Sequence, residues 1–127
     1  MNAPAIKRQR VAVLGASPNP ERYSHKAVEA LLRHGHEVIP VHPDSPEVAG
    51  IKAWACLNKI EGCVNTLTIY VSPSRLTEIK PRILELKPGR VIFNPGTEHH
   101  SVMEELKQHG IEVIQACTLV MLATGQF

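Results

Sequence analysis

The sequence predicts one three-layer α/β domain built on a five-stranded parallel sheet. Short apolar runs alternate along the chain with segments in which apolar residues recur every three or four positions, the pattern of repeated βαβ units. The first apolar run, 11–14, leads directly into Gly15 and a proline-containing loop before helical spacing begins. A buried strand followed by a tight loop and a helix start is typical of the first unit of a nucleotide-binding fold. The length of 127 residues suits a single hydrophobic core.

Five strands are predicted because each is a short run of aliphatic or β-branched residues bounded by glycine, proline or polar residues. They cover residues 10–14, 37–41, 66–71, 90–93 and 111–114. Right-handed crossovers would join them into a parallel sheet with the strand order 3-2-1-4-5. In that order the crevice beside the first strand is the expected ligand site. The predicted fold is therefore Rossmann-like.

Helical segments are predicted between the strands from apolar residues at helical spacing. They cover residues 24–34, a short turn at 56–60, then 72–86, 97–109 and 118–123. Ser24 is the expected N-cap of the first helix, and Gly35 is expected to end it in a left-handed conformation. Pro81 interrupts the helical pattern around it, so we expect a kink or two short helices there.

Composition and termini argue against several classes of protein. The 14 basic and 12 acidic residues nearly balance, and 4% aromatic content leaves few stacking platforms, so nucleic-acid binding is not expected. Three cysteines without a C-x-x-C pair argue against a disulfide framework or a zinc site, and the histidines lack metal-ligand spacing. We expect a cytoplasmic protein without a membrane segment, with a flexible leader (1–9) before the domain (10–127).

Candidate binding residues gather in the loop after the first strand. Gly15-Ala16-Ser17 keeps only the first glycine of a G-x-G-x-x-G motif, so it predicts either a phosphate loop or an ordinary strand-to-helix turn. In the first case its backbone N–H groups would hold a phosphate beside the helix start. Ser17 and Ser24 offer hydroxyl groups, whereas Arg22, His25 and Lys26 provide either anion-binding cations or a solvated basic face.

The end of the second strand distinguishes between nucleotide ligands. Folds that bind NAD usually place an acidic residue there to accept a hydrogen bond from the ribose 2′-hydroxyl. This chain has His42 instead, and the nearest acid is Asp44. The sequence therefore disfavours NAD and leaves NADP or coenzyme A, unless His42 is merely an exposed loop residue.

Two further strand ends carry small and proline residues, which leave room for an extended ligand or serve as ordinary turns and caps. They are Val71-Ser72-Pro73 and Asn94-Pro95-Gly96. Cys117 precedes the last helix, where it is either a thiol of lowered pKa or a small buried residue. No catalytic residues are predicted.

Several short motifs together give the chain a family resemblance. They are Val13-Leu-Gly-Ala-Ser17 with Asn19, Pro20, Arg22 and Ser24; Val38-Ile-Pro-Val-His-Pro43; Ile69-Tyr-Val-Ser-Pro73; Asn94-Pro-Gly-Thr-Glu98; and 112–122 with Ala116-Cys-Thr118. From Arg10 onward the chain resembles the small CoA-binding proteins, whose fold is that of the N-terminal domain of the succinyl-CoA synthetase α subunit.

The resemblance implies a site for coenzyme A or acyl-CoA across the strand ends. It implies phosphates near 15–17 and 24–26, the adenosine near 41–43 and 71–73, and the pantetheine arm near 94–96 and Cys117. Asn19 is a further expected binding residue. His42 departs from the family, in which Asn is frequent at this position. The catalytic domains of the synthetase have no counterpart here. We therefore expect a non-catalytic carrier, sensor or regulatory module, which could form a homo-oligomer. The alternatives are an NAD(P)-binding oxidoreductase and a CoA-thioester enzyme that needs a partner subunit.

Overall fold

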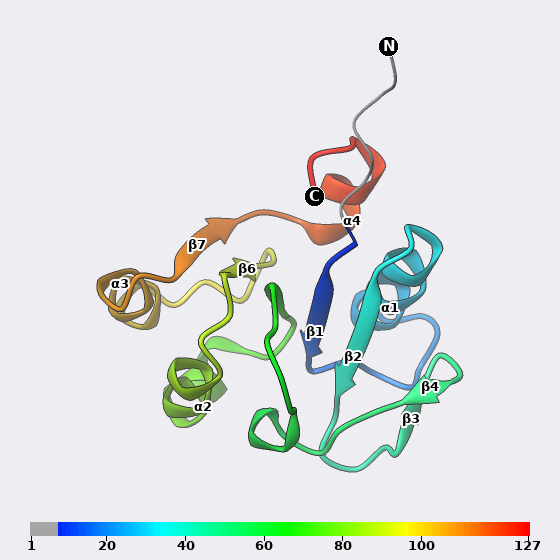
Figure 1. Ribbon diagram of the computed structural model, residues 1–127, viewed down its shortest axis with the longest axis horizontal. Helices are drawn as coiled ribbons and strands as arrows, with labels where there is room; N and C mark the ends of the chain where they lie inside the picture. Colours follow the sequence, from blue (N-terminus) through cyan, green and yellow to red (C-terminus); the bar gives the residue numbers. More distant parts are fainter. Residues whose placement is uncertain (1–7) are drawn as a thin grey trace.

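A computed structural model describes residues 8–127 and confirms the α/β class with a five-stranded, all-parallel sheet (Figure 1). The sheet strands are β1 (Arg10–Leu14), β2 (Glu37–Val41), β5 (Thr66–Ile69), β6 (Arg90–Phe93) and β7 (Glu112–Gln115). The helices are α1 (Tyr23–Arg33), α2 (Pro73–Leu86), α3 (His100–Gln108), α4 (Thr118–Ala123) and the short 3₁₀ helix η1 (Leu57–Lys59). A small hairpin of β3 (Glu47–Val48) and β4 (Ile51–Lys52), which the sequence did not predict, lies between β2 and η1.

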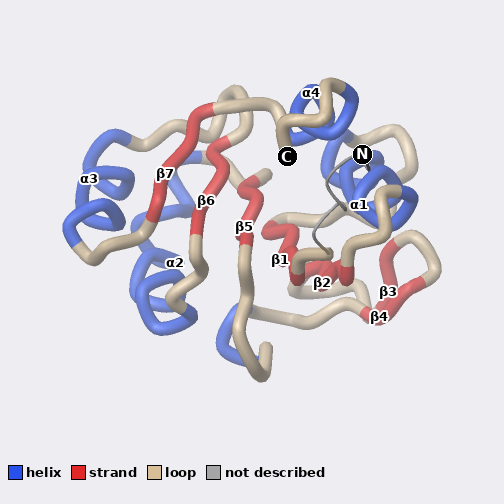
Figure 2. The backbone as a smooth tube through the Cα atoms, turned by 45° about the horizontal axis from the view of Figure 1, so that its top comes forward, coloured by secondary structure: helices blue, strands red, loops and turns tan. Residues whose placement is uncertain are grey.

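Helices cover both faces of the sheet, as Figure 2 shows with α2 and α3 on one side of the strands and α1 and α4 on the other. Each face has its own apolar core. One contains Leu67, Leu76 and Phe93, and the other contains Val11 and Leu31. The strands alternate their side chains between these two cores, which explains why they read as almost continuously apolar.

The strand order is β2-β1-β5-β6-β7, so the predicted order 3-2-1-4-5 is wrong and the observed order is 2-1-3-4-5. Pro40 gives the physical reason. Its carbonyl points away from β1 and accepts a hydrogen bond from the Trp54 backbone N–H at 2.9 Å. The missing N–H of Pro40 belongs to that same outer edge, so no full strand can pair there and β2 must be an edge strand.

The third strand instead lies beside β1 on the inner side, where all four residues of β5 are buried. The order of the strands reverses between β1 and β5, so the expected crevice lies between the loops that leave these two strands. The correction therefore brings the Gly15 loop next to the segment 70–72.

Other expectations differ in detail. The helix α2 runs through Pro81 without being split in two, and β5 ends at Ile69 rather than at residue 71. Gly35 follows α1 with a φ of +84°, as expected. The predicted leader lies mostly outside the described residues, but Gln9 donates its backbone N–H to His36 Nδ1 at 3.0 Å. No helix of the described chain is long and apolar enough to cross a membrane.

His36 is a buried histidine near the amino end of the sheet. Its side chain packs against Phe127 with the ring centres 5.1 Å apart, and it is 6% exposed. Burial, reinforced by the positive charges of His34 and Arg90, lowers the pKa of His36 below its usual 6.5. The folded protein therefore keeps this imidazole neutral.

The lowered pKa predicts a dependence of stability on pH. As pH falls, the unfolded chain binds the proton before the folded chain does. The contribution of neutral His36 to the free energy of unfolding should therefore be complete above about pH 6.5 and decrease below it. The decrease should be at most about 1.4 kcal/mol per pH unit and should stop at the folded-state pKa. Urea unfolding of wild type and of His36→Gln between pH 7.5 and 5 measures this contribution. Identical pH profiles for the two proteins would contradict it.

Candidate functional site

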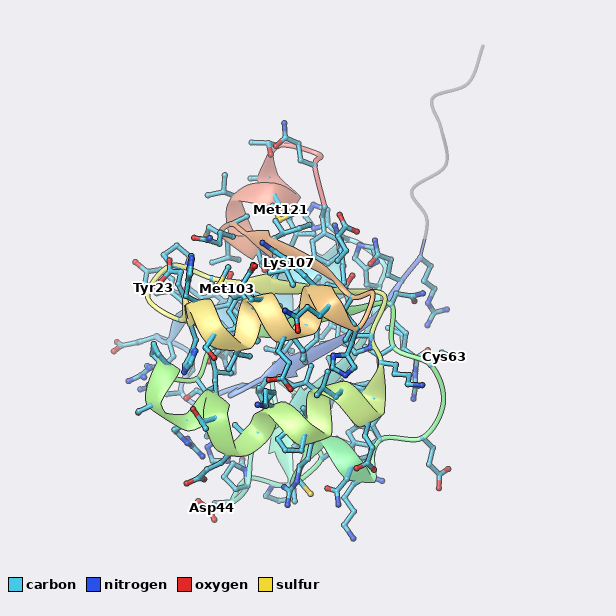
Figure 3. The ribbon with its side chains drawn as sticks, turned by 90° about the vertical axis from the view of Figure 1, so that its left-hand side faces the viewer. Tyr23, Asp44, Cys63, Met103, Lys107 and Met121 are labelled. Atoms are coloured by element: carbon cyan, nitrogen blue, oxygen red, sulfur yellow. The ribbon has the colours of Figure 1, made fainter. Side chains whose placement is uncertain are left out.

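A cleft of about 770 Å³ opens at the carboxyl ends of β1, β2 and β5, between these strands and the side of α2. In Figure 3, Tyr23 and Asp44 lie at this end of the molecule, on the left of the view, and Cys63 lies at the opposite end. The volume of the cleft falls within the range of small-molecule and cofactor sites. The predicted site residues that line it are Gly15, Ser17, Arg22, Val41, His42, Pro43, Val71 and Ser72.

A second pocket of about 350 Å³ adjoins the cleft. It is lined by Tyr23, Tyr70, Asn94, Pro95, Cys117 and Leu119, three of which are predicted site residues. Tyr70 lines both spaces, and Arg22 of the cleft is followed directly by Tyr23 of the second pocket. A ligand could therefore extend from one space into the other. The cleft has charged walls, whereas no charged side chain among residues 8–127 lines the second pocket.

The backbone N–H groups of the first loop are already used within the protein. Those of Gly15 and Ala16 donate to the Val41 carbonyl at 3.0 and 3.1 Å, and that of Ser17 donates to Ser24 Oγ at 3.0 Å. In this structure these three groups are therefore not free to hold a phosphate, because the loop turns back onto β2 and α1. Ser24 is also not the N-cap; that position is Arg22.

Ser24 and His25 support the loop from inside the first turn of α1. Both side chains are buried, and His25 Nδ1 lies 2.8 Å from the Ser17 carbonyl oxygen. The second ring nitrogen, Nε2, is 3.8 Å from a carboxylate oxygen of Glu29. These two residues thus hold both backbone groups of Ser17 and position the loop rather than face the cleft.

Five other predicted site residues line neither space. Ala16 is fully buried, and Asn19 accepts a hydrogen bond from the Glu21 N–H within its own turn. The remaining three are Lys26, Pro73 and Gly96. Lys26 is exposed with its ammonium 5.7 Å from the Tyr23 ring centre.

Unused backbone donors lie instead at the start of α1. Among the described residues, the N–H groups of Tyr23, Ser24 and His25 have no acceptor, as expected for the first turn of a helix. Arg22, whose side chain lines the cleft, directly precedes them. Free N–H groups, the helix dipole and a guanidinium together favour an anion here.

Two arginines of the site were missed from the sequence. Arg75 and Arg82 are exposed and line the cleft from α2, together with Glu78. In the part of the chain that the structure describes, neither guanidinium forms an ion pair with a carboxylate. Their spacing of seven residues, which places both on one helix face, was the signal that could have identified them.

Asn94 fixes the floor of the second pocket. Its side-chain amide donates to Thr68 Oγ1 at 2.7 Å and to the Ile69 carbonyl at 2.9 Å, while its Oδ1 accepts from the Thr118 N–H at 2.9 Å. One buried side chain therefore joins the end of β6 to β5 and to the start of α4. The neighbouring thiol of Cys117 is half-buried.

Tyr70 separates the two spaces and carries a buried hydroxyl. Thr68 and Thr118 lie close by, but their hydroxyls bond to each other at 2.8 Å, and the Tyr70 hydroxyl has no partner among the described residues. Burial, followed by the proximity of Cys117, raises the pKa of Tyr70 to about 12, and the nearby Thr118 and Thr68 side chains oppose this rise. The phenol is therefore a protonated hydrogen-bond donor at neutral pH.

Comparison with known proteins gives the site a family context. A family model described as a CoA binding domain matches residues 9–123. The uncharacterized protein YneT of Bacillus subtilis is 30% identical over 108 residues, which cover 85% of this chain and 80% of that protein.

Two solved structures have the same fold. One, of an uncharacterized protein, shares 44% sequence identity with a TM-score of 0.90 and covers 96% of this chain and 100% of its own. The other, cell-free ID.343 from Thermus thermophilus, shares 32% identity with a TM-score of 0.87 over 94% of this chain and 91% of that chain. Neither description states a function. The family match over nearly the whole domain confirms the resemblance found in the sequence, and the chain belongs to the CoA-binding domain family.

Proposed function

We propose that this protein binds coenzyme A or an acyl-CoA without catalysing a reaction on it, as a carrier, sensor or regulatory module. Family membership supports a CoA ligand. The observation that carries the proposal is the pairing of a large cleft with charged walls and a smaller pocket without charges. Coenzyme A has the same two-part character, since an anionic nucleotide is joined to an uncharged pantetheine arm.

The groups that line the two spaces fit the diphosphate, the adenosine and the pantetheine arm of coenzyme A. The diphosphate would accept hydrogen bonds from the free N–H groups of 23–25 beside Arg22. The adenosine would lie between the segments 41–43 and 71–72, and the pantetheine arm would continue past Tyr70 toward Cys117. His42 fits here as a loop-forming residue, because its Nδ1 accepts the Asp44 N–H at 3.1 Å.

Calorimetry with coenzyme A, dephospho-CoA, NAD⁺ and NADP⁺ tests the proposal. NAD⁺ is the second candidate because the carboxylate of Asp44 lines the cleft, where it could accept from a ribose hydroxyl. We expect measurable binding of coenzyme A and weaker binding of both dinucleotides. Absence of heat with coenzyme A at millimolar concentration, or tighter binding of NAD⁺, would overturn the proposal.

The two arginines of α2 provide a residue-level prediction. Arg75→Ala and Arg82→Ala should each weaken CoA binding by about three- to tenfold, since an exposed guanidinium that contacts phosphate is worth on the order of 1 kcal/mol. The affinity should also become less sensitive to salt. Arg33→Ala is the matched control, because Arg33 lies in the last turn of α1 and does not line the cleft. Equal affinities for all three variants would contradict the role of Arg75 and Arg82.

A further inference from the structure

The second pocket differs from the cleft in chemistry as well as in size. Its six lining residues include Leu119, Pro95 and two tyrosines and no ionisable carboxylate, lysine or arginine. An uncharged wall of this kind favours apolar groups and makes burial of a carboxylate costly. The pocket is therefore suited to an end of a ligand that carries no charge.

The position of the second pocket indicates which end of the ligand would enter it. It begins at Tyr70, where the cleft ends, and it reaches Cys117 and Leu119 at the start of α4. A ligand whose phosphates lie at the first turn of α1 would place its opposite end here. Tyr70 lines both spaces, and its hydroxyl is buried without a partner among the described residues.

We propose that the second pocket receives the acyl group of a coenzyme A thioester, so that the protein prefers a short, uncharged acyl chain over the free thiol. This inference rests on the proposed function and adds the chemical class of the ligand's reactive end. The pocket volume of about 350 Å³ would hold the end of the pantetheine arm, the thioester and an acyl chain of a few carbons. A four-carbon acyl group that ends in a carboxylate should then bind more weakly than one that ends in a methyl group.

A titration series with the wild-type protein under reducing conditions tests the proposal. Coenzyme A, acetyl-CoA, butyryl-CoA and succinyl-CoA are compared by calorimetry. Each buried methylene should strengthen binding about fourfold, so butyryl-CoA, which has two more methylenes, should bind about fifteenfold more tightly than acetyl-CoA. Succinyl-CoA, which has the same number of acyl carbons as butyryl-CoA, should bind at least tenfold more weakly than butyryl-CoA.

Two tryptophan variants of α4 localise the effect. Leu119→Trp fills the pocket and should remove the preference for butyryl-CoA over coenzyme A, whereas Val120→Trp, at a 57% exposed position on the same helix, should retain it. If coenzyme A binds but the four ligands have equal affinities, or succinyl-CoA equals butyryl-CoA, the acyl pocket is refuted while the CoA site stands. If no ligand of the series binds, the proposed function itself fails.

Discussion

A Gly15→Ala variant is expected to be less stable than wild type by about 2–4 kcal/mol, and to bind coenzyme A at least about tenfold more weakly. Gly15 has a φ of +85°, and a methyl group there would lie 2.9 Å from Val71 Cγ1 and 3.2 Å from the Tyr70 carbonyl carbon. The Tyr70 backbone cannot move without disturbing β5. The loop after β1 would therefore shift, and with it the first turn of α1 that we propose holds the diphosphate.

Gly35→Ala is the matched control for this prediction. Gly35 has nearly the same φ, +84°, but a methyl group there would meet no atom within 4 Å. The Gly35→Ala variant should lose only about 1–2 kcal/mol of the free energy of unfolding, because alanine disfavours the left-handed conformation, and its affinity for CoA should be unchanged. Urea unfolding and calorimetry with coenzyme A are measured for both variants. The comparison separates the effect of backbone strain from that of the steric clash between the new methyl group and the segment 70–71. Equal losses of stability, with equal affinities for coenzyme A, would show that close approach of the loop to the segment 70–71 is unimportant.

Asn94→Ala should reduce the free energy of unfolding by about 2–4 kcal/mol, because it leaves buried partners without hydrogen bonds. The partners are the Thr118 N–H and the Ile69 carbonyl, and the Asn94 side chain itself is 3% exposed. Loss of the amide should also loosen the contact between β6 and α4, and so weaken the binding of a ligand that reaches the second pocket.

Asn58→Ala provides the comparison for Asn94→Ala. Asn58 is exposed in η1, so its replacement should change stability by no more than about 0.5 kcal/mol. Asn94→Asp is a second test, since it keeps the acceptor for Thr118 but removes both donated bonds, and it should also destabilise the protein. Chemical denaturation measures the free energy of unfolding of the three variants. An Asn94→Ala protein as stable as Asn58→Ala would contradict the proposed buried network.

The sequence was sufficient for the fold class and for most elements. Strong apolar runs predicted all five sheet strands, and the helix α4 has the predicted bounds. Strand order was mispredicted because two parallel orders satisfy right-handed crossovers equally well. Pro40 contained the information that decides between them, since a proline within a strand whose N–H side faces outward requires an edge position. The hairpin of β3 and β4 was missed because each strand has only two residues.

The site was predicted less completely than the fold. The strand-end loops were found, because residues that follow parallel strands meet at one edge of the sheet. Which groups face the ligand could not be read from the sequence. Ser24 and His25 turn inward to hold Ser17, and the free N–H groups are those of 23–25 in the first turn of α1 rather than those of 15–17. Arg75 and Arg82 were overlooked because basic residues on a helix surface usually serve only solvation.

The proposed function depends on the first turn of α1, which would hold the diphosphate of coenzyme A. An amide NMR titration with coenzyme A tests it most directly. We expect the amide signals of Tyr23, Ser24 and His25 to shift most, while those of Cys63 and Gly89, at the opposite end of the sheet, stay in place. Binding that leaves the signals of 23–25 unchanged, or that shifts signals equally across the protein, would contradict it.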